Sequence, residues 1–301
     1  MKAMILAAGY GTRLRPLTNK KPKALVPVVN RPIVSKNIEY LRKSGVSAIL
    51  INAHHHARQV SDFIEGGRPL GLKVDVRVEP EILGTGGGIK NAEDFWDQRP
   101  FVVVNSDILT DIDLGPIYEH HCRSKTIATL VVHDCEPYNQ IQLDDRGAVA
   151  DIAGTYSPGR LAFTGIHIIE PKLLAHIPGG RFWDIIDTYR ELIHTGKTIG
   201  AYRAERHYWR DIGTISSYKA VNRELLDQAS TAAIGPGCQL DPTVRLEEWA
   251  VVGPKSRLEQ GVEIRRSILW ENVRVRFGVK VIDSIVTSDQ EVDRDLISEI
   301  L

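Results

Sequence analysis

A glycine-rich segment follows the first apolar stretch of the chain and combines residue types that bind phosphate. It reads LAAGYGTRLRPLT over residues 6–18, and its two glycines allow a tight backbone turn whose N–H groups can approach a ligand closely. Such N–H groups form a concave site for phosphate oxygens, and Arg13 adds a planar, permanently charged group suited to a polyphosphate. No Walker lysine and no third glycine of G-x-G-x-x-G is present, so the pattern also fits a plain strand-to-loop turn.

A second candidate phosphate ligand, Lys23, lies in the proline-rich stretch that comes next. Prolines at positions 16, 22, 27 and 32 exclude a regular helix, so we expect an extended, stiff loop. Lys23 stands between Pro22 and the segment ALVP, which holds it better than the other basic residues nearby. Its place in a loop after a buried strand favours ligand binding over a solvated surface charge.

Two aspartates are candidates for binding a hard metal ion, because each follows a short strand-like segment. Asp107 comes after the apolar segment 101–104 and is expected at the carboxyl end of a strand, where open α/β sheets bind ligands. Asp211 follows the pair Tyr-Trp and one arginine and precedes Gly213, again at a predicted strand end. Two carboxylates, completed by phosphate oxygens and water, suit Mg²⁺. The alternatives are an Asx turn at Asp107 and an ion pair between Asp211 and Arg210.

The elements that must position these residues alternate between short apolar runs and amphipathic stretches. This alternation up to about residue 110 predicts a parallel, helix-covered sheet, and shorter spacers further on predict an antiparallel addition to it. The expected strands are 2–6, 48–52, 73–78, 101–105, 127–133, 140–144, 162–169 and 198–203, and the expected helices are 33–43, 58–65, 182–194 and 217–229.

The pattern changes near residue 230, where apolar residues begin to recur every six positions. Ile234, Leu240, Leu246, Val252, Leu258 and Ile264 follow this period without a break, and after one slip it resumes at Leu269, Val275 and Val281. Small or β-branched residues stand four positions after most of them. A six-residue period predicts a parallel β-helix rather than ordinary strands, which have period two. We expect domains at 1–230 and 231–301, with the polar segment 287–299 capping or trailing the coil.

Composition places the chain among ordinary globular proteins. Of its 301 residues 43% are hydrophobic and 25% charged, and 38 basic residues balance 38 acidic ones, which makes a nucleic-acid partner improbable as the main function. The three cysteines are scattered, as expected for reduced thiols in the cytoplasm. No segment approaches the roughly 18 apolar residues of a membrane span, so we expect a cytoplasmic protein without a membrane partner.

The motifs in their order resemble those of the sugar-1-phosphate nucleotidyltransferases, and look most like the mannose-1-phosphate guanylyltransferase group. The resemblance is carried by LAAGYGTRLRPLT with PKALVPV, GTGGGI at 84–89, VVNSD at 103–107, FTGIHI at 163–168 and YWRDIGT at 208–214. It implies a Rossmann-like mixed α/β catalytic domain, and the six-residue repeats resemble the short left-handed β-helix that many members carry behind it.

The resemblance implies an enzyme that joins a nucleoside triphosphate to a sugar 1-phosphate and releases pyrophosphate, by in-line attack with Mg²⁺. The base remains open between guanylyl, uridylyl and thymidylyl transfer. A non-catalytic regulatory relative is disfavoured because Arg13, Lys23, Asp107 and Asp211 are all present. An acyltransferase in the β-helix is disfavoured because residues 231–301 contain no histidine.

The family's site residues can be carried over position by position. The catalytic set is Arg13, Lys23, Asp107 and Asp211, with both aspartates as Mg²⁺ ligands. The implied nucleotide-binding residues are Ala7, Ala8, Gly9, Gly11, Thr12, Arg13, Glu79, Gly84, Thr85 and Asn105, and the implied sugar-binding residues are Gly165 and Asn105. Glu79 would accept from base N–H donors, which guanine, uracil and thymine all offer. Alternatives are a helix-entry loop at the glycine run, a loop-holding role for Asn105 and a strand bulge at Gly165.

The coil also suggests self-association. Trp249 and Trp270 fall between the inward-facing positions of the repeat, so we expect both indoles to be exposed on its faces. Exposed aromatic side chains on a regular surface favour an interface, which predicts a homo-oligomer.

Overall fold

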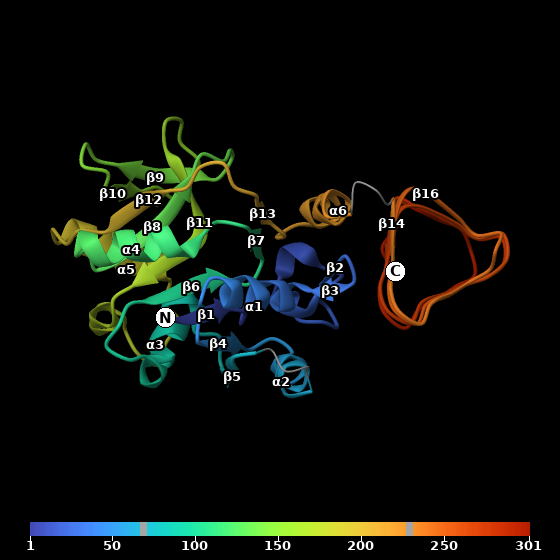
Figure 1. Cartoon of the computed structure of the whole chain (residues 1–301), viewed down its shortest axis with the longest axis horizontal. Helices are drawn as coiled ribbons and strands as arrows, with labels where there is room; N and C mark the ends of the chain where they lie inside the picture. Colours follow the sequence, from blue (N-terminus) through green and yellow to red (C-terminus); the bar gives the residue numbers. More distant parts are fainter. Residues whose placement is uncertain (67–70, 227–230) are drawn as a thin grey trace. The chain divides into compact units, whose positions relative to one another are not determined.

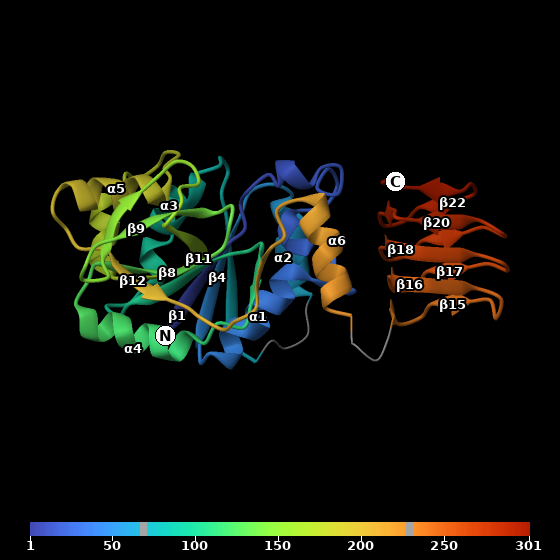
Figure 2. The same ribbon diagram turned by 90° about the horizontal axis from the view of Figure 1, so that it is seen from above.

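The computed structural model describes residues 1–66, 71–226 and 231–301, and these residues divide into two compact units. Unit 1 comprises Met1–Tyr10, Pro22–Ala24 and Val34–Asp211, and unit 2 comprises Gly11–Lys21, Leu25–Ile33 and Ile212–Leu301. The expected domain boundary at residue 230 and the end of the expected helix 217–229 lie outside the described residues. Figures 1 and 2 show the elements of each unit.

The parallel core of unit 1 has its strands in the order β6-β1-β4-β5, as the alternation of elements predicts. The register aligns Leu6 of β1 with Asn52 of β4 and with Asn105 of β6, so three carboxyl ends meet at one edge. Strands β1, β4 and β6 are apolar and largely buried, as expected for parallel strands covered by helices, whereas β5 at the edge alternates charged and apolar residues and is partly exposed. The bounds are β1 Lys2–Leu6, β4 Ala48–Ala53, β5 Lys73–Val78 and β6 Phe101–Asn105.

The antiparallel addition begins at β11, which pairs with β6 and also with β8 and β9. Strand β12 then runs parallel to β8, so that His133 and Arg203 end their strands at the same edge as Asn105. The bounds are β8 Ala128–His133, β9 Asn139–Leu143, β10 Val149–Ile152, β11 Leu161–Ile169 and β12 Gly200–Arg203.

Helices cover both faces of this sheet, with α3 and α5 on one side and α1 and α4 on the other (Figure 2). Asp113 and Asp184 begin α4 and α5 by accepting hydrogen bonds from the backbone N–H groups of Gly115 and Ile186, as good N-cap residues do. The bounds are α1 Ile33–Lys43, α2 Ala57–Glu65, α3 Gly84–Asn91, α4 Leu114–Ser124 and α5 Ile185–His194.

The proline-rich segment is more structured than the extended loop expected from its sequence. It contains short 3₁₀ turns at Thr12–Leu14 and Lys23–Leu25, and a hairpin formed by β2 (Pro27–Val28) and β3 (Arg31–Pro32). Prolines exclude a long α-helix but are compatible with single turns and hairpin edges, which explains the difference.

The rest of unit 2 consists of α6 (Ile215–Glu224) and a β-helix. Helix α6 begins with a capping box in which the side chains of Thr214 and Ser217 each accept from the other residue's backbone N–H. In the coil, Leu246 pairs with Ile264 and Ile264 pairs with Val281, steps of 18 and then 17 residues. These steps confirm the three-fold use of a six-residue period and the slip expected between Ile264 and Leu269, and a shorter step of 15 residues, from Val281 to Leu296, follows at the end of the coil. Figure 1 looks along the coil and shows its three sides.

Most strands of the coil are short, and the apolar residues of the repeat from Leu240 onward form its core, whereas Ile234, the first of the series, is 51% exposed. They are β14 Ala232–Ile234, β15 Gln239–Leu240, β16 Arg245–Val252, β17 Arg257–Leu258, β18 Glu263–Leu269, β19 Arg274–Val275, β20 Lys280–Ile282, β21 Ile285–Val286, β22 Glu291–Val292 and β23 Leu296–Ile297. The expected fold class, a mixed α/β sheet followed by a parallel β-helix, is confirmed.

Two expectations about the coil are wrong. The polar segment 287–299 does not cap or trail it, because β22 and β23 pair in parallel with β19 and β20 and so add a further turn. Trp249 and Trp270 are buried, with exposed fractions of 8% and 2%. Trp270 is covered by Lys21 and Tyr218, which lie outside the repeat, so the period does not reveal its burial. None of the described helices is long and apolar enough to cross a membrane.

Candidate active site

The predicted site residues of unit 1 gather at the edge where β1, β4 and β6 end. Asn52, the partner of Leu6 in the β1–β4 register, accepts a hydrogen bond from the N–H of Ala7 at 2.8 Å. The N–H of Ser106 donates to the carbonyl of Leu6 at 3.1 Å. These bonds fix the backbone that leaves β1 against the backbone that leaves β6, so the Gly-rich turn and Asp107 start from a common edge.

Asp107 and Lys23 form an ion pair at this edge. The Nζ atom of Lys23 donates to Oδ2 of Asp107, and the two side chains are only 13% and 18% exposed. The loop that carries Asp107 is anchored from α1, where Asn37 Nδ2 donates to the carbonyl of Ser106 at 2.9 Å. Two residues predicted for the same chemistry, 84 positions apart in the chain, are thus brought into contact.

Asp211 reaches the same edge through a short two-stranded sheet. Strand β13 (Trp209–Asp211) pairs antiparallel with β7 (Ile108–Thr110), and the register sets Asp211 opposite Ile108, the residue after Asp107. The sheet therefore places Asp211 opposite the strand that begins directly after Asp107. Arg210 alternates to the other side of β13, where its guanidinium lies 5.6 Å from the centre of the Tyr208 ring.

Gly165 packs against Asn105 beside these aspartates. Its φ is +78°, and a Cβ atom there would lie 2.8 Å from Asn105 Nδ2 and 3.2 Å from a side-chain carbon of Ile108. The β11–β8 register shifts between Phe163 and His167, so the strand bulge considered from sequence is also present. Trp209 donates from its indole N–H to the carbonyl of Thr164 at 2.9 Å, which ties β13 to this bulge.

Glu79 is buried and engaged inside the protein. It is 1% exposed, its Oε1 accepts from Asn52 Nδ2 at 2.8 Å, and its Oε2 accepts from the N–H of Leu83 at 3.2 Å. Burial raises the pKa of this carboxyl group, and the hydrogen bonds oppose that rise. Asn52, which links Glu79 to Ala7, was not among the predicted residues. A buried polar residue at the end of an apolar strand was the signal that could have found it.

The glycine run is helical rather than a turn, since Gly84–Asn91 forms α3. A Cβ on Gly84 or Gly87 would lie 2.7 Å from a backbone carbonyl, that of Trp183 or of Arg181. Thr85 Oγ1 accepts from the N–H of Ile185 at 2.9 Å. The small residues therefore allow α3 to pack closely on the segment that starts α5. Gly84 and Thr85 make these contacts in the structure.

The phosphate-turn residues of unit 2 are organised around Gly11. This glycine has φ +62°, and its carbonyl accepts from the N–H of Leu14 at 2.9 Å and from Thr18 Oγ1 at 2.9 Å. The turn leaves Thr12 and Arg13 exposed. In unit 1, Ala8 is buried, and a Cβ atom added to Gly9 would have no neighbour within 4 Å.

The residues present fit a magnesium ion that is completed by substrate. Asp107 and Asp211 supply carboxylate oxygens, the hard donors that Mg²⁺ takes. Over residues 1–66, 71–226 and 231–301, no group of three or more His, Cys, Asp or Glu side chains could enclose a metal. A two-carboxylate site is the arrangement in which Mg²⁺ keeps waters and phosphate oxygens as its other ligands.

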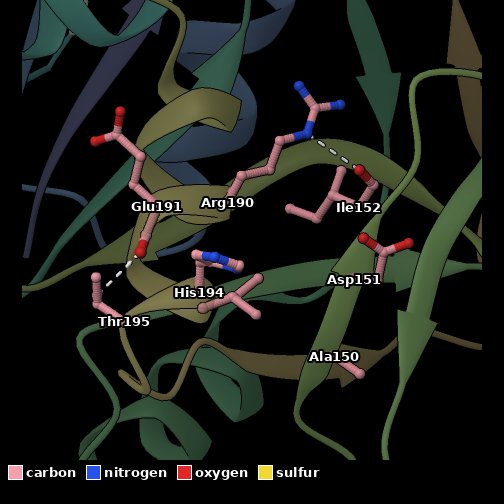
Figure 3. Close-up of a pocket in the computed structure, with 8 residues that line it drawn as sticks. Ala150, Asp151, Ile152, Arg190, Glu191, His194 and Thr195 are labelled. Carbon is pink, nitrogen blue, oxygen red and sulfur yellow. Dashed lines mark hydrogen bonds between the residues drawn. The ribbon is translucent and has the colours of Figure 1, made fainter.

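Two cavities lie outside the predicted residues. One, of about 510 Å³, lies at the ends of β8 and β12 and is lined by residues that include His133, Arg203 and Arg210. The other, of about 650 Å³, lies between β10 and α5, where Arg190 Nε donates to the carbonyl of Ile152 at 3.1 Å (Figure 3). None of the predicted site residues lines either of these two cavities.

Comparisons with known proteins agree with this geometry. Residues 2–228 match the family model described as nucleotidyl transferase. The N-acetylmuramate alpha-1-phosphate uridylyltransferase of Neisseria meningitidis is 31% identical over 73% of this chain and 96% of its own. The UTP–glucose-1-phosphate uridylyltransferase of a Synechocystis strain is 27% identical over 98% of this chain and 89% of its own. The crystal structure of HddC from Yersinia pseudotuberculosis in complex with GMP-PN superposes with a TM-score of 0.66 at 25% identity, covering 75% of this chain and 99% of HddC.

The family match covers the five motifs and the strand-end site together, and the curated relatives cover most of the chain. The chain therefore belongs to the nucleotidyl transferase family and is an enzyme of the sugar-1-phosphate nucleotidyltransferase type.

Proposed function

We propose that this protein transfers a nucleotidyl group from a nucleoside triphosphate to a sugar 1-phosphate, and that the Lys23–Asp107 pair beside Asp211 is the centre of the reaction. The observation that carries this proposal is the ion pair itself, because it joins two predicted residues at the edge where α/β sheets bind ligands. Strand β13 adds Asp211, which lies opposite Ile108 in the β13–β7 register.

In the proposed reaction the phosphate oxygen of the sugar attacks the α-phosphorus in line, and pyrophosphate leaves. Such a transfer asks the protein mainly to position the reactants and to neutralise charge. Lys23 neutralises phosphate oxygens, and Asp107 orients its ammonium group. Arg13, exposed on its 3₁₀ turn, binds the triphosphate chain. Mg²⁺, held by Asp107 and Asp211, would supply charge compensation on the phosphates when bound.

The other predicted residues take roles that follow from their contacts. Asn105 and Gly165 form the surface for the sugar, because a side chain at Gly165 would collide with Asn105. The backbone of residues 7–12 binds phosphate. Glu79 acts through Asn52, which holds Ala7, and Gly84 and Thr85 act by fixing α3 against α5. These three are positioning residues in the proposal, rather than direct ligands of the base.

For the base we propose guanine, with mannose 1-phosphate or a related sugar as acceptor. Support comes from HddC in complex with GMP-PN and from the Mycobacterium tuberculosis mannose-1-phosphate guanylyltransferase, which is 24% identical over 92% of this chain. Uridylyl transfer is the second candidate, because the relatives at 31% and 27% identity are named uridylyltransferases.

The deciding experiment is a screen of pyrophosphate release with GTP, UTP, dTTP and ATP against a panel of sugar 1-phosphates, with and without Mg²⁺. We expect one triphosphate to exceed the others by at least about tenfold in kcat/KM, equivalent to about 1.4 kcal/mol. A Lys23→Met variant should lose this activity in every combination. If the rate of pyrophosphate release were unchanged in Lys23→Met, Lys23 would have no role in the reaction.

We further propose that residues 1–230 form the catalytic domain and 231–301 a separate domain, in a cytoplasmic homo-oligomer. The buried tryptophans no longer support association, but Phe277 and Ile297 of the coil are 69% and 62% exposed. Light scattering at about micromolar concentration, where associations of this kind are measurable, tests the oligomer. A monodisperse monomer would contradict it.

A further inference from the structure

The β-helix of unit 2 contacts the same proline-rich segment that carries Lys23. Lys21 Nζ donates to Glu271 Oε1 at 2.8 Å and lies 5.5 Å from the centre of the Trp270 ring. The two charged side chains are 21% and 40% exposed, and Trp270 is buried. Lys23 follows Lys21 by two residues, so this contact restrains the chain directly before the predicted phosphate ligand.

A second set of bonds restrains the chain after Lys23. Tyr218 of α6 is fully buried, and its hydroxyl donates to the carbonyl of Pro27 at 2.6 Å. The indole N–H of Trp270 donates in turn to the Tyr218 hydroxyl oxygen at 3.0 Å. One tryptophan of the coil therefore supports both sides: its ring lies beneath Lys21, and its N–H orients the group that holds Pro27.

The hairpin that begins at Pro27 is held in a strained conformation. Val29 and Asn30, at its turn, have φ values of +48° and +62°, and a β-branched residue at positive φ is a strong outlier. Strain of this kind persists only where the surroundings impose it. Here the N–H of Val29 donates to Asn222 Oδ1 at 2.8 Å, and Asn30 Nδ2 donates to the carbonyl of Val252 in the coil at 2.9 Å.

The charge of Glu271 is favoured in the folded protein. Burial alone would raise the pKa of its carboxyl group, but the hydrogen bond and charge of Lys21, together with further hydrogen bonds, lower it overall. The ion pair is therefore formed at neutral pH. It links a repeat of the coil to the segment 11–33 rather than stacking one repeat on the next, as Glu259 does with Arg274.

We propose that Trp270 and Glu271 are positioning residues for nucleotidyl transfer: the β-helix holds the two segments that flank Lys23, through Lys21 on one side and the 27–32 hairpin on the other. The effect on turnover rests on the proposed function, whereas the effect on the loop does not. The coil thus acts on the chemistry through the backbone of the phosphate-binding segment, without contributing a group that touches substrate.

The test compares matched variants of the full chain. Glu271→Gln removes the charge that holds Lys21, and Glu259→Gln makes the same change at a carboxylate that pairs only within the coil. Trp270→Phe removes the indole N–H, and Trp249→Phe makes the same change at the other buried tryptophan of the coil. Lys21→Met removes the charge and Lys21→Arg retains it.

Two readouts are needed. Hydrogen exchange of the backbone amides in residues 11–33, without substrate, should rise about fivefold in Glu271→Gln, Trp270→Phe and Lys21→Met, as expected for a partly exposed ion pair. Pyrophosphate release should show a comparable fall in kcat with little change in KM. The two controls and Lys21→Arg should match the wild type in both.

The outcomes separate the two proposals. If the wild type is active and Glu271→Gln cannot be distinguished from Glu259→Gln in exchange or in kcat, the positioning role is wrong. If the wild type releases no pyrophosphate with any substrate pair, the proposed function fails, and hydrogen exchange alone decides whether the coil holds the loop.

Discussion

The sheet of unit 1 and the coil of unit 2 are both built from parallel strands, but they use them differently. In the sheet, helices separate the strands, and each carboxyl end delivers a different residue, such as Asn52, Asn105 and Asp107, to one edge. In the coil, each strand stacks on an equivalent strand of the next turn, 18 residues away for Leu246 on Ile264 and 15 for Val281 on Leu296.

Polar residues show the consequence of this difference. In the coil, Arg266 pairs with Glu248 of one repeat and Asp283 of the next, so charges are used for stacking. At the edge of the sheet, Lys23 and Asp107 form an ion pair that is not part of any repeating pattern. In the coil, each turn is stabilised by contacts with the turns next to it. At the edge of the sheet, the polar residues are not needed for stacking and can take part in chemistry.

The largest expected effect is at Asp107. Asp107→Asn removes the charge that pairs with Lys23 and one of the two proposed carboxylate ligands for Mg²⁺, so kcat/KM should fall by about 10³-fold, or about 4 kcal/mol of transition-state stabilisation. Steady-state pyrophosphate release measures it, with circular dichroism to confirm folding. Asp145→Asn, at an exposed position of the same unit, is the control and should be fully active. Near-normal turnover in Asp107→Asn would show that the edge of the sheet is not the reaction centre.

The next largest effect is expected on the stability of the coil. Leu258 is 1% exposed in the core of the β-helix, and Leu258→Ala should lower the free energy of unfolding of the coil by about 3 kcal/mol. Because Leu258 packs in the core of the coil, exchange of amides in β1, β4 and β6 should not change. Hydrogen exchange under increasing denaturant measures both regions in one experiment. Equal destabilisation of the sheet would mean that the two regions unfold as one.

A smaller effect is expected at Gly165. Gly165→Ala should reduce kcat/KM by about 30-fold, or about 2 kcal/mol, because a Cβ at φ +78° would displace the Asn105 amide. Gly147 has the same φ of +78° but no neighbour within 4 Å, so Gly147→Ala carries the backbone strain without the collision. Steady-state kinetics of both variants, with thermal unfolding, separate the two causes. Equal kinetic losses in the two variants would assign the effect to strain alone.

The smallest effect for a single side chain is the dependence of the stability of unit 1 on pH, through its buried histidines. Burial lowers the pKa of His121 and His133 to about 4 and that of His167 to about 3, all in unit 1. Between these values and about 6.5 the unfolded chain binds protons that the folded chain does not, so stability falls as pH decreases below 6.5. We expect a loss of about 1.4 kcal/mol per pH unit for each histidine. Denaturant unfolding of unit 1 at pH 7, 6 and 5 measures it.

The coil should respond differently to acid. It has no histidine, and arginines favour the charged form of two of its carboxylates: the hydrogen bond from Arg266 lowers the pKa of Asp283, and the hydrogen bond from Arg274 lowers the pKa of Glu259. Groups with a lowered pKa lose their stabilising effect only as pH falls through that lowered value. The coil should therefore keep its stability at pH 5, and a parallel loss in both regions would contradict this assignment.

The sheet and the coil also differ in how much of their structure can be predicted from the sequence. The six-residue period identified Val252, Leu258 and Ile264 as core residues of the coil, because in a repeat one face of the chain must point inward at every step. The period could not predict that Trp270 is buried, since its cover comes from residues 21 and 218, which lie outside the repeat.

The sequence alone predicts the α/β class, the coil and the residues that the family resemblance implies for the chemistry, since strand ends, glycines and repeats are local patterns. Which of these residues contact one another depends on the tertiary structure. Lys23 contacts Asp107, and β13 pairs with β7, because the fold brings together segments that are far apart in the sequence. The internal role of Glu79 and the helical state of Gly84–Asn91 were likewise decided by packing, because Asn52 and Trp183 approach them from distant segments.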